Sequence, residues 1–374
     1  MTRFAHMADV HLGAGRSTGR IDEIRKSFEL AFDEANKDPN IEFILIAGDV
    51  FDRVRPPWSL LADFVQLMRT AEKQIYVLAG NHDTSRVRTA GSFWDVFDSL
   101  DLPYVWFIHG YESQVFHHSI SETEIDLGII CTPWGALQDP SDRERRDDFY
   151  VEMIEEMPVI WVTHGVAEGV TGSHAEFLRP VIMNEEMEKY AYVALGDLHT
   201  EGQVQENAWY SGSTDRMNWS DIGAQPHWLD VTLEDGELEV VERYIEVRKM
   251  IKLMDLNATG YTGDDLVAYF KDIFVDPDVM MSVLVYGCER SAFRQLVQTY
   301  KHFPFLKMTH QPYETPEGDY ELKADQEQKS VTELFSDFLN HRSKEGAYTP
   351  EFEQRMRTEG ANYLERAQET ESED

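Results

Sequence analysis

The segment IEFILIAGDVFD, residues 41–52, joins an apolar run to two aspartates. Within it, residues 43–47 (FILIA) are continuously apolar, which is typical of a strand buried on both faces of a sheet. Asp49 follows this run after a single glycine, and Asp52 comes three residues later. In open α/β sheets ligands bind beyond the carboxyl ends of the strands, so polar side chains placed there point into the site. The segment therefore predicts an α/β fold with a polar site at one edge of a sheet.

The same alternation of strand-type and helical patterns extends through the first half of the chain. Strands are expected at residues 4–8, 43–47, 75–79, 127–131, 159–162 and 192–195. Apolar side chains recur at helical spacing from Ile24 to Ala35 and from Leu60 to Ala71. Alternating strands and helices predict βαβ units and a largely parallel sheet. Residues 228–247 alternate apolar and polar side chains around an Asp-Gly turn, which predicts a β-hairpin that closes the domain.

A second unit is predicted from residue 250 onward. Its order is strand (251–256), helix (264–273), strand (280–286), helix (291–302) and strand (305–308), typical of a small α+β domain. Further on, an apolar stripe at helical spacing is formed by Val331, Leu334, Phe335, Phe338 and Leu339. This stripe either packs on its own chain or docks on a partner. In the first half, the run DRERRDD at 142–148 is interpreted as a solvated charged turn.

Composition limits the classes of function. The chain has 374 residues with 69 acidic against 34 basic side chains, a formal net charge of −35, which argues against non-specific nucleic-acid binding by the whole surface. A locally basic groove stays open. Two cysteines exclude a disulfide framework and argue against a cysteine-based zinc site. No apolar run reaches the roughly 18–20 residues of a membrane helix and no signal peptide is visible, so a cytoplasmic protein without membrane association is expected.

Five expected strands end in residue types that bind metals. The endings are Asp9-Val-His11, Gly48-Asp49-Val-Phe-Asp52, Gly80-Asn81-His82-Asp83, Thr163-His164-Gly165 and Gly196-Asp197-Leu198-His199. If they converge, the ligand set is Asp9, His11, Asp49, Asn81, His164, Asp197 and His199. Carboxylate, amide and imidazole donors without thiols suit Mn²⁺, Fe²⁺ or Zn²⁺. Seven ligands are too many for one ion and suit two ions about 3.5–4 Å apart that share one carboxylate.

The pattern DxH…GDxxD…GNHD…H…GDxH resembles the calcineurin-like metallophosphoesterase superfamily. More narrowly, DVHLG at 9–13, GDVFDRVRP at 48–56, GNHDTSR at 80–86, THGVAEG at 163–169 and YSGSTDRMNWSD at 210–221 resemble the SbcD-type nuclease family. The resemblance covers residues 1–247 at motif level, and 248–320 only in the order of elements. It implies an α/β metallophosphoesterase β-sandwich core flanked by helices (1–247), a small α+β cap domain that binds DNA (248–320), and C-terminal helices that bind a partner (321–374).

The resemblance also implies roles for single residues. Asp9, His11, Asp49 and His199 would hold one metal ion, and Asp49, Asn81, His164 and Asp197 the other, with Asp49 bridging. His82 would face the scissile phosphate, Asp83 would hold the His82 ring, and Asp52 would lie just behind the ligands. The family's last motif is usually GHxH, whereas this chain has GDLH. We expect Asp197 to bind the second ion as a harder ligand, and the alternative is that it turns away.

The implied activity is that of a two-metal DNA nuclease in repair or recombination. It would act as a 3′–5′ exonuclease on duplex ends and as an endonuclease on single strands or hairpins. Mn²⁺ is the expected cofactor, with Mg²⁺ or Fe²⁺ as alternatives, and the expected partners are DNA, an SbcC-like ABC-type ATPase and a second copy of the nuclease. Rival hypotheses are a phosphatase or cyclic-nucleotide phosphodiesterase on the same scaffold, and a scaffold protein weakened by the GDLH motif.

Arginines near the motifs offer one way for an acidic protein to meet DNA. They are Arg16, Arg20, Arg53, Arg55, Arg86, Arg88 and Arg216. All lie on expected loops at the carboxyl ends of strands, so we expect them to surround the site and to contact phosphates. The alternative is that they pair with the abundant surface acids.

Overall fold

The computed structural model describes residues 1–311 except 17, 86, 88–90, 121–124, 155–156, 171–181, 201, 272–277 and 304. Contacts divide the chain into two compact units, Met1–Glu314 and Thr315–Asp374. The predicted C-terminal helices and their apolar stripe lie outside the described residues, as do Arg86 and Arg88. The expected domain boundaries at residues 247 and 320 stay a prediction.

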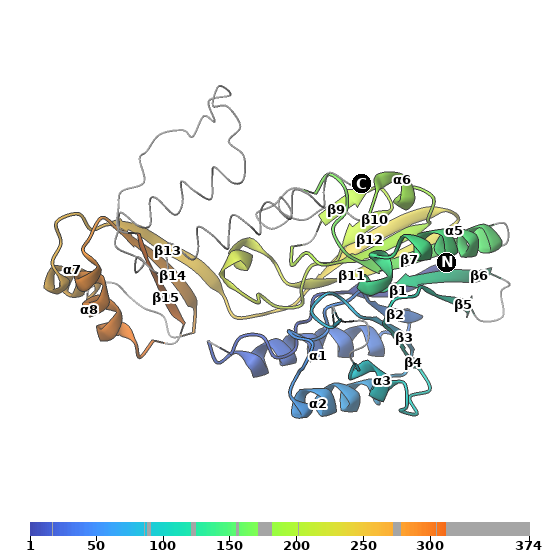
Figure 1. Cartoon of the computed structure of the whole chain (residues 1–374), viewed down its shortest axis with the longest axis horizontal. Coiled ribbons are helices and arrows are strands. Elements are labelled where there is room, and N and C mark those ends of the chain that lie inside the picture. Colours follow the sequence, from blue (N-terminus) through green and yellow to red (C-terminus); the bar gives the residue numbers. More distant parts are fainter. Residues whose placement is uncertain are drawn as a thin grey trace, which may run out of the picture. The chain divides into compact units, whose positions relative to one another are not determined.

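Two six-stranded sheets form most of the first unit (Figure 1). The first has the order β12 (Glu237–Tyr244), β11 (His227–Glu234), β1 (Thr2–Met7), β2 (Phe43–Ile46), β3 (Gln74–Leu78) and β4 (Val105–Ile108). The second has the order β5 (Gln114–Ile120), β6 (Ile125–Thr132), β7 (Val159–His164), β8 (Tyr192–Gly196), β10 (Ala208–Tyr210) and β9 (Gly202–Gln205). Strands β1–β4 are parallel to one another, as are β6–β8, which confirms the predicted parallel pairing.

The sheets pack face to face around a shared apolar core, so the fold is the expected sandwich. Successive side chains of β2 alternate between two cores because strand side chains point to opposite faces. Phe43 and Leu45 pack between the sheets, whereas Ile44 and Ile46 pack against the helices. All four are fully buried, and burying a side chain of this size contributes about 1.5–3 kcal/mol. The continuous apolar run was therefore a correct signal for a doubly covered strand.

Helices cover both outer faces of the sandwich. Among the described residues of this unit, the α-helices are α1 (Ile21–Lys37), α2 (Trp58–Met68), α3 (Trp94–Phe97), α4 (Trp134–Leu137), α5 (Pro140–Ile154) and α6 (Asn184–Met187), together with α7 (Gly263–Lys271) and α8 (Arg290–Tyr300), which pack on the separate three-stranded sheet. Figure 1 shows α1, α2 and α3 together beside the first sheet, and side chains of all three enter one core with β1–β3. Met153 of α5 and Met187 of α6 pack on the outer face of the second sheet. The predicted charged turn at 142–148 is wrong, because these residues lie within α5.

The hairpin and the three-stranded sheet follow the expected order. Strands β11 and β12 are antiparallel and turn at Asp235 (φ 51°) and Gly236 (φ 82°), a left-handed pair that suits a tight hairpin. Beyond them, β13 (Met250–Asn257), β14 (Met280–Tyr286) and β15 (Leu306–Gln311) form a parallel sheet. This sheet has its own apolar core with α7 and α8. The predicted alternation of strands and helices in this part is confirmed.

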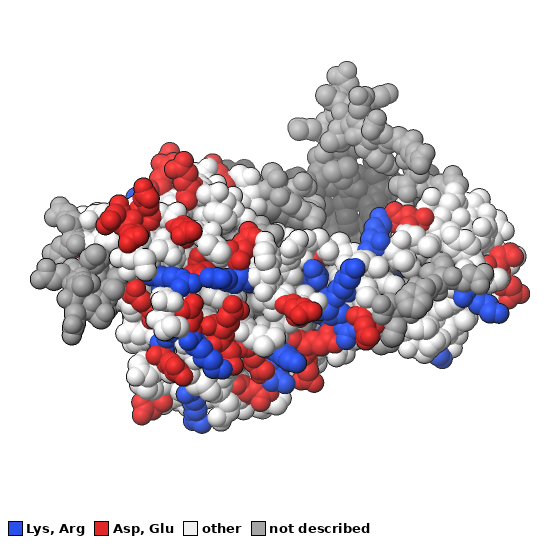
Figure 2. All heavy atoms as spheres, turned by 180° about the vertical axis from the view of Figure 1, so that it is seen from behind, with Lys and Arg blue, Asp and Glu red and all other residues white. Residues whose placement is uncertain are grey.

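The surface is rich in carboxylates of Asp and Glu. On the face drawn in Figure 2, acidic and basic side chains are interspersed, and no continuous basic surface is visible. Among the helices of the described residues, none combines the length and the apolar composition that a bilayer span requires. The drawn face therefore offers no broad electrostatic attraction for a polyanion.

Three charged side chains from neighbouring strands meet on the first sheet. Arg3 of β1 donates from Nε to Asp230 of β11 over 2.7 Å, and Arg243 of β12 donates from Nε over 2.9 Å. Burial by itself raises the pKa of Asp230, but the hydrogen bonds from the two arginines hold that pKa below its usual value. Folding therefore stabilises the charged form of Asp230, which links this cluster to pH.

Replacing Asp230 by Asn should lower the free energy of unfolding at neutral pH and have little effect in acid. A carboxyl with a depressed folded-state pKa contributes stability above its unfolded value of about 3.9, and loses it as the pH falls through the folded-state pKa. In urea titrations, the difference between wild type and Asp230→Asn should be larger at about pH 6 than at about pH 3. Glu237→Gln, at the exposed start of β12, is the control. A difference that does not vary with pH would contradict this role.

Candidate functional site

Four predicted ligands lie on left-handed backbone directly after strands. Their φ angles are 51° at Asp9, 47° at His11, 50° at Asp49 and 113° at Asp197. Residues other than glycine rarely adopt positive φ, and such strained residues cluster at functional sites. Backbone hydrogen bonds hold the loops together, from the Asp9 N–H to the Gly48 carbonyl (3.1 Å) and from the His11 N–H to the Asp49 carbonyl (2.9 Å). The turns after β1 and β2 therefore support each other.

Two glycines of the motifs allow the loops to approach closely. A Cβ atom on Gly48 would lie 2.2 Å from Nδ1 of His164, and Gly48 also has a φ of 95°. A Cβ atom on Gly80 would lie 2.2 Å from Oδ1 of Asp49. Both distances are shorter than any real contact, so a side chain at either position would displace a predicted ligand. The Gly-Asp and Gly-Asn spacing is thus a steric requirement of the site.

One half of the cluster brings Asp9, His11 and His199 together. The Nε2 atoms of His11 and His199 lie 3.0 Å apart, and His11 Nε2 lies 4.0 Å from Asp9 Oδ1. One ligand atom from each of these three residues lies within 4.8 Å of the other two. His11 Nε2 is also 3.6 Å from Asp49 Oδ2. These converging donors could hold one metal ion.

The other half gathers around His164. Its Nε2 atom lies 3.4 Å from Asp49 Oδ1, 2.9 Å from Asn81 Oδ1 and 3.6 Å from Asp197 Oδ1. Asp9, Asp49 and His164 form a further group of ligand atoms within 4.8 Å of one another. Asp49 presents one oxygen to each half, as a bridging carboxylate must. Asp197 lies near His164 but belongs to neither of these two groups, so its ligation stays a prediction.

Buried negative charge dominates the electrostatics of the cluster. Burial raises the pKa of the Asp9 carboxyl to about 7 and also raises the pKa of Asp197. Burial acts on Asp49 in the same direction, yet His164 and His11 hold the pKa of Asp49 well below its usual range. Within the described residues, these three carboxylates form ion pairs with histidines only. Buried carboxylates without Arg or Lys partners suit divalent cations, which supply the missing positive charge.

His82 is the exposed member of the cluster. Its backbone N–H donates to Asp49 Oδ1 over 2.8 Å, and its Nδ1 lies 3.1 Å from the carbonyl oxygen of Asp52. The His82 ring stands edge-on to the His11 ring, with centroids 4.8 Å apart. One ligand atom each of His11, Asp49 and His82 also lies within 4.8 Å of the others. His82 is thus near the ligands while its ring remains open to solvent, which suits a group that meets a substrate.

The predicted contact between Asp83 and the His82 ring is wrong. Asp83 does not hold the ring: it is buried and accepts backbone N–H groups of Val50 and Phe51, each over 2.8 Å, and of Gly80 over 3.3 Å. Its carboxylate instead fixes the turn that carries Asp49, because an acidic side chain aimed at unpaired backbone donors binds them first. Asp52 contacts His82 through its backbone carbonyl, while its carboxylate pairs with Arg53 over 3.2 Å.

The predicted ring of phosphate-binding arginines is wrong at two positions. Arg20 is buried and donates to Asp215, to Glu23 and to the carbonyl of Arg216. Arg216 is half-buried and donates to the carbonyls of Ala224 and Arg248. These two arginines connect the start of α1 to the loop after β10 by hydrogen bonds, so their guanidinium groups stabilise the fold and do not face a substrate. A buried acid at position 215, which sequence reasoning overlooked, explains why Arg20 turns inward.

The remaining arginines keep their predicted exposure where the structure describes them. Arg16, Arg53 and Arg55 are exposed on the loops after β1 and β2. Arg53 pairs with Asp52 in the manner of a surface ion pair, which is worth little by itself. Phosphate contact by these three stays a prediction.

Asp221 is a functional-site residue that the motifs did not single out. It lies in the short 3-10 helix η2 (Trp219–Gly223), and its Oδ2 is 3.1 Å from Nδ1 of His199. The signal was present, because Asp221 ends the motif YSGSTDRMNWSD. No strand was predicted before this motif, so the sequence offered no reason to place that carboxylate beside a histidine.

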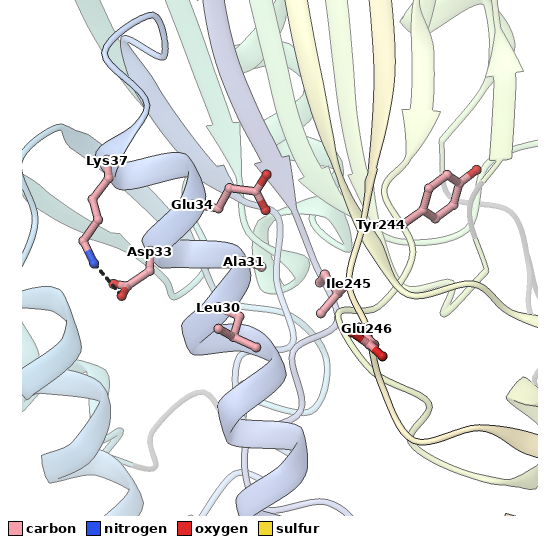
Figure 3. Close-up of a pocket in the computed structure, with 8 residues that line it drawn as sticks. All are labelled: Leu30, Ala31, Asp33, Glu34, Lys37, Tyr244, Ile245 and Glu246. Carbon is pink, nitrogen blue, oxygen red and sulfur yellow. Dashed lines mark hydrogen bonds and ion pairs between the residues drawn. The ribbon is translucent and has the colours of Figure 1, made fainter. Parts of the chain in front are cut away.

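A separate hollow of about 430 Å³ lies between α1 and the chain around the end of β12 (Figure 3). It is lined by Leu30, Ala31, Asp33, Glu34, Lys37, Tyr244, Ile245 and Glu246. None of the predicted site residues lines it. Three of its side chains are carboxylates, so it is unsuited to a phosphate substrate.

Part of the chain that forms this site matches a known protein family. Residues 2–156 match the calcineurin-like phosphoesterase family, and these residues supply Asp9, His11, Asp49, Asn81 and His82. The mixed α/β sandwich is consistent with a metallophosphoesterase fold, and its groups of Asp and His could bind metal ions.

Three relatives are similar to parts of this chain. The DNA double-strand break repair protein Mre11 of Aeropyrum pernix is 44% identical over 94 residues, 24% of this chain and 22% of that protein. The Mre11 of Archaeoglobus fulgidus is 34% identical over 106 residues, 27% of this chain and 23% of that protein. The SbcD component of the Escherichia coli nuclease SbcCD is 22% identical over 315 residues, 75% of this chain and 77% of that protein. The match thus spans less than a quarter of either Mre11, and these relatives support the resemblance to the SbcD-type family.

Proposed function

We propose that this chain is a two-metal DNA nuclease of the SbcD type, with Mn²⁺ as its cofactor. The observation that carries the proposal is the convergence of Asp9, His11, Asp49, His164 and His199 in a largely buried cluster, where the carboxylates form ion pairs with histidines only among the residues that the structure describes. The names of the relatives, a component of a nuclease and a DNA double-strand break repair protein, favour DNA as the substrate. The alternative, a phosphatase, is supported only by the fact that phosphatases and nucleases share the metallophosphoesterase scaffold.

The residues of this chain have distinct tasks in the proposed mechanism. Asp49 lies between two sets of donors and would hold both ions, while the left-handed turns at Asp9 and His11 preset the directions of their side chains. When bound, the ions would supply a hydroxide at neutral pH and neutralise the phosphate charge. His82 is exposed beside this cluster, and its protonated ring would donate from Nε2 to the leaving 3′-oxygen. Asp83 would keep Asp49 in position through the backbone that it binds.

The partners are part of the same proposal. A chain with a net charge of −35 attracts DNA poorly by itself, so it needs either local arginines or a partner that binds DNA. Arg16, Arg53 and Arg55 are the exposed candidates for local contact. An SbcC-like ATPase would supply the remaining affinity, and the apolar stripe that begins at Val331 is its proposed docking segment.

A cleavage assay distinguishes the two enzymatic hypotheses. The full chain is incubated with blunt duplex DNA, hairpin DNA and p-nitrophenyl phosphate, each with Mn²⁺, Mg²⁺ or Zn²⁺. We expect Mn²⁺-dependent shortening of the duplex from its 3′ ends and nicking of the hairpin, with little release of p-nitrophenol. Rapid hydrolysis of the monoester with intact DNA would instead identify a phosphatase. Metal binding without hydrolysis of any substrate would identify the inactive scaffold.

A further inference from the structure

In three histidines of the candidate site, Nδ1 lies within hydrogen-bond distance of an oxygen that accepts a hydrogen bond but cannot donate one. His164 and His82 donate from Nδ1 to backbone carbonyl oxygens, over 2.8 and 3.1 Å. His199 differs, because its Nδ1 lies 3.1 Å from a side-chain carboxylate, Asp221 Oδ2. An acceptor at Nδ1 requires a proton on that atom, so the lone pair of the neutral ring is on Nε2, the atom that faces the cluster.

We propose that Asp221 is a positioning residue that prepares His199 for metal binding, an inference that rests on the proposed two-metal function. By accepting the Nδ1 proton, Asp221 selects the tautomer of His199 and fixes the ring so that Nε2 lies 3.0 Å from His11 Nε2. Of the three ring partners, Asp221 is the one supplied by a side chain. A substitution can therefore remove this partner, whereas the carbonyl partners of His164 and His82 belong to the backbone.

The Asp221 carboxylate is itself held before any metal arrives. Its Oδ2 also accepts the backbone N–H groups of Met217 (2.8 Å) and Asn218 (3.1 Å), and its Oδ1 accepts the hydroxyl of Ser220 (3.2 Å). The residue is buried, so water competes little for these contacts. An anchored anion both orients the ring and increases the basicity of Nε2, which strengthens a metal–imidazole bond.

Two substitutions separate the hydrogen bond from the charge. Asp221→Ala removes the acceptor for His199. Asp221→Asn keeps it, because the amide nitrogen cannot occupy the Oδ2 position opposite two backbone N–H donors, so the amide oxygen takes that place. We expect Asp221→Ala to weaken Mn²⁺ binding at one of two sites by about 10- to 100-fold. Asp221→Asn should weaken Mn²⁺ binding at that site by a smaller factor. The measurement is a Mn²⁺ titration of the metal-free full chain, with free Mn²⁺ followed by electron paramagnetic resonance.

Asp221 could instead act only by holding η2 together, and a double-mutant cycle tests this directly. If Asp221 acts through His199, Asp221→Ala should cause no additional loss of Mn²⁺ affinity in a His199→Ala background. Asn218→Ala removes the side-chain acceptor of the Ser220 N–H at the start of η2 without touching His199, and should leave Mn²⁺ affinity unchanged. Equal losses in both backgrounds, or the same loss in Asn218→Ala, would overturn the positioning role.

A second readout needs no metal. In ¹⁵N spectra of metal-free protein with labelled histidines, His199 should be protonated on Nδ1 in wild type and in Asp221→Asn, and should become a tautomer mixture in Asp221→Ala. An unchanged tautomer in Asp221→Ala would refute the inference. Wild-type protein that binds no Mn²⁺ would refute the proposed function, whereas two bound Mn²⁺ ions with unchanged affinity in Asp221→Ala would refute the role of Asp221 alone.

Discussion

Asp49→Asn should eliminate at least one bound Mn²⁺ ion and reduce DNA cleavage by about 10³-fold or more, because a bound cation is worth several kcal/mol to the transition state. Asp49 presents Oδ2 to His11 at 3.6 Å and Oδ1 to His164 at 3.4 Å, so it serves both halves of the cluster. The amide has the same shape but lacks the charge, and its nitrogen cannot bind a metal ion as a carboxylate oxygen does. The effect should therefore exceed that of losing any ligand that serves one ion.

Metal content and cleavage of duplex DNA are measured together for Asp49→Asn. The control is Asp33→Asn on the surface of α1, where the carboxylate pairs with Lys37 over 2.7 Å and lies outside the cluster. Thermal unfolding of the metal-free forms checks that Asp49→Asn still folds. Two bound ions and normal cleavage in Asp49→Asn would refute the bridging role.

His82→Ala should lower the rate of DNA cleavage by about 10²- to 10⁴-fold, the usual contribution of a general acid, while both Mn²⁺ ions remain bound. The ring is exposed, and its Nδ1 donates to the carbonyl of Asp52, so a proton for the leaving group must come from Nε2. Because p-nitrophenolate leaves without protonation, the loss should be much smaller for a p-nitrophenyl nucleotide diester than for DNA.

The comparison of the two leaving groups identifies the role of His82. An equal loss with both substrates would contradict proton donation and would favour contact with the phosphate instead. A loss of bound Mn²⁺ would make His82 a ligand, since one of its ring nitrogens lies within 4.8 Å of ligand atoms of His11 and Asp49. His109→Ala, which removes an imidazole paired with Asp98 outside the cluster, is the control.

The site could be predicted to a large extent because the strand signals were strong. Apolar runs located β1, β2, β3, β7 and β8 to within a few residues, and each was followed by Asp, Asn or His. The carboxyl ends of neighbouring parallel strands lie at one edge, so local signals were enough to predict that Asp9 and Asp49 meet; His164 ends β7 of the second sheet, and its approach depends on how the two sheets pack. The resemblance to a family supplied the sandwich, since pairing between distant strands leaves little local trace.

The errors at Arg146 and Arg20 share one cause, because each concerned a charged side chain whose partner lies far away in the chain. Arg146 in the run DRERRDD seemed to require solvent, but it is buried over the Trp161 ring at 4.3 Å and pairs with Glu186. Arg20 was expected to contact DNA, but Asp215, 195 residues later, binds it instead. Burial of such a charge depends on a matching partner, and spacing in the sequence contains no information about that partner.

The sequence alone determined which residue types stand at the strand ends, because period and composition are local properties that the backbone must obey. Only the tertiary structure decided how their side chains are oriented. It directed Asp83 toward backbone donors instead of His82, turned Arg20 inward, and brought Asp221 to His199. The physical reason is that a polar side chain in a buried site must find a hydrogen-bond partner, and which partner is in reach depends on how distant segments pack.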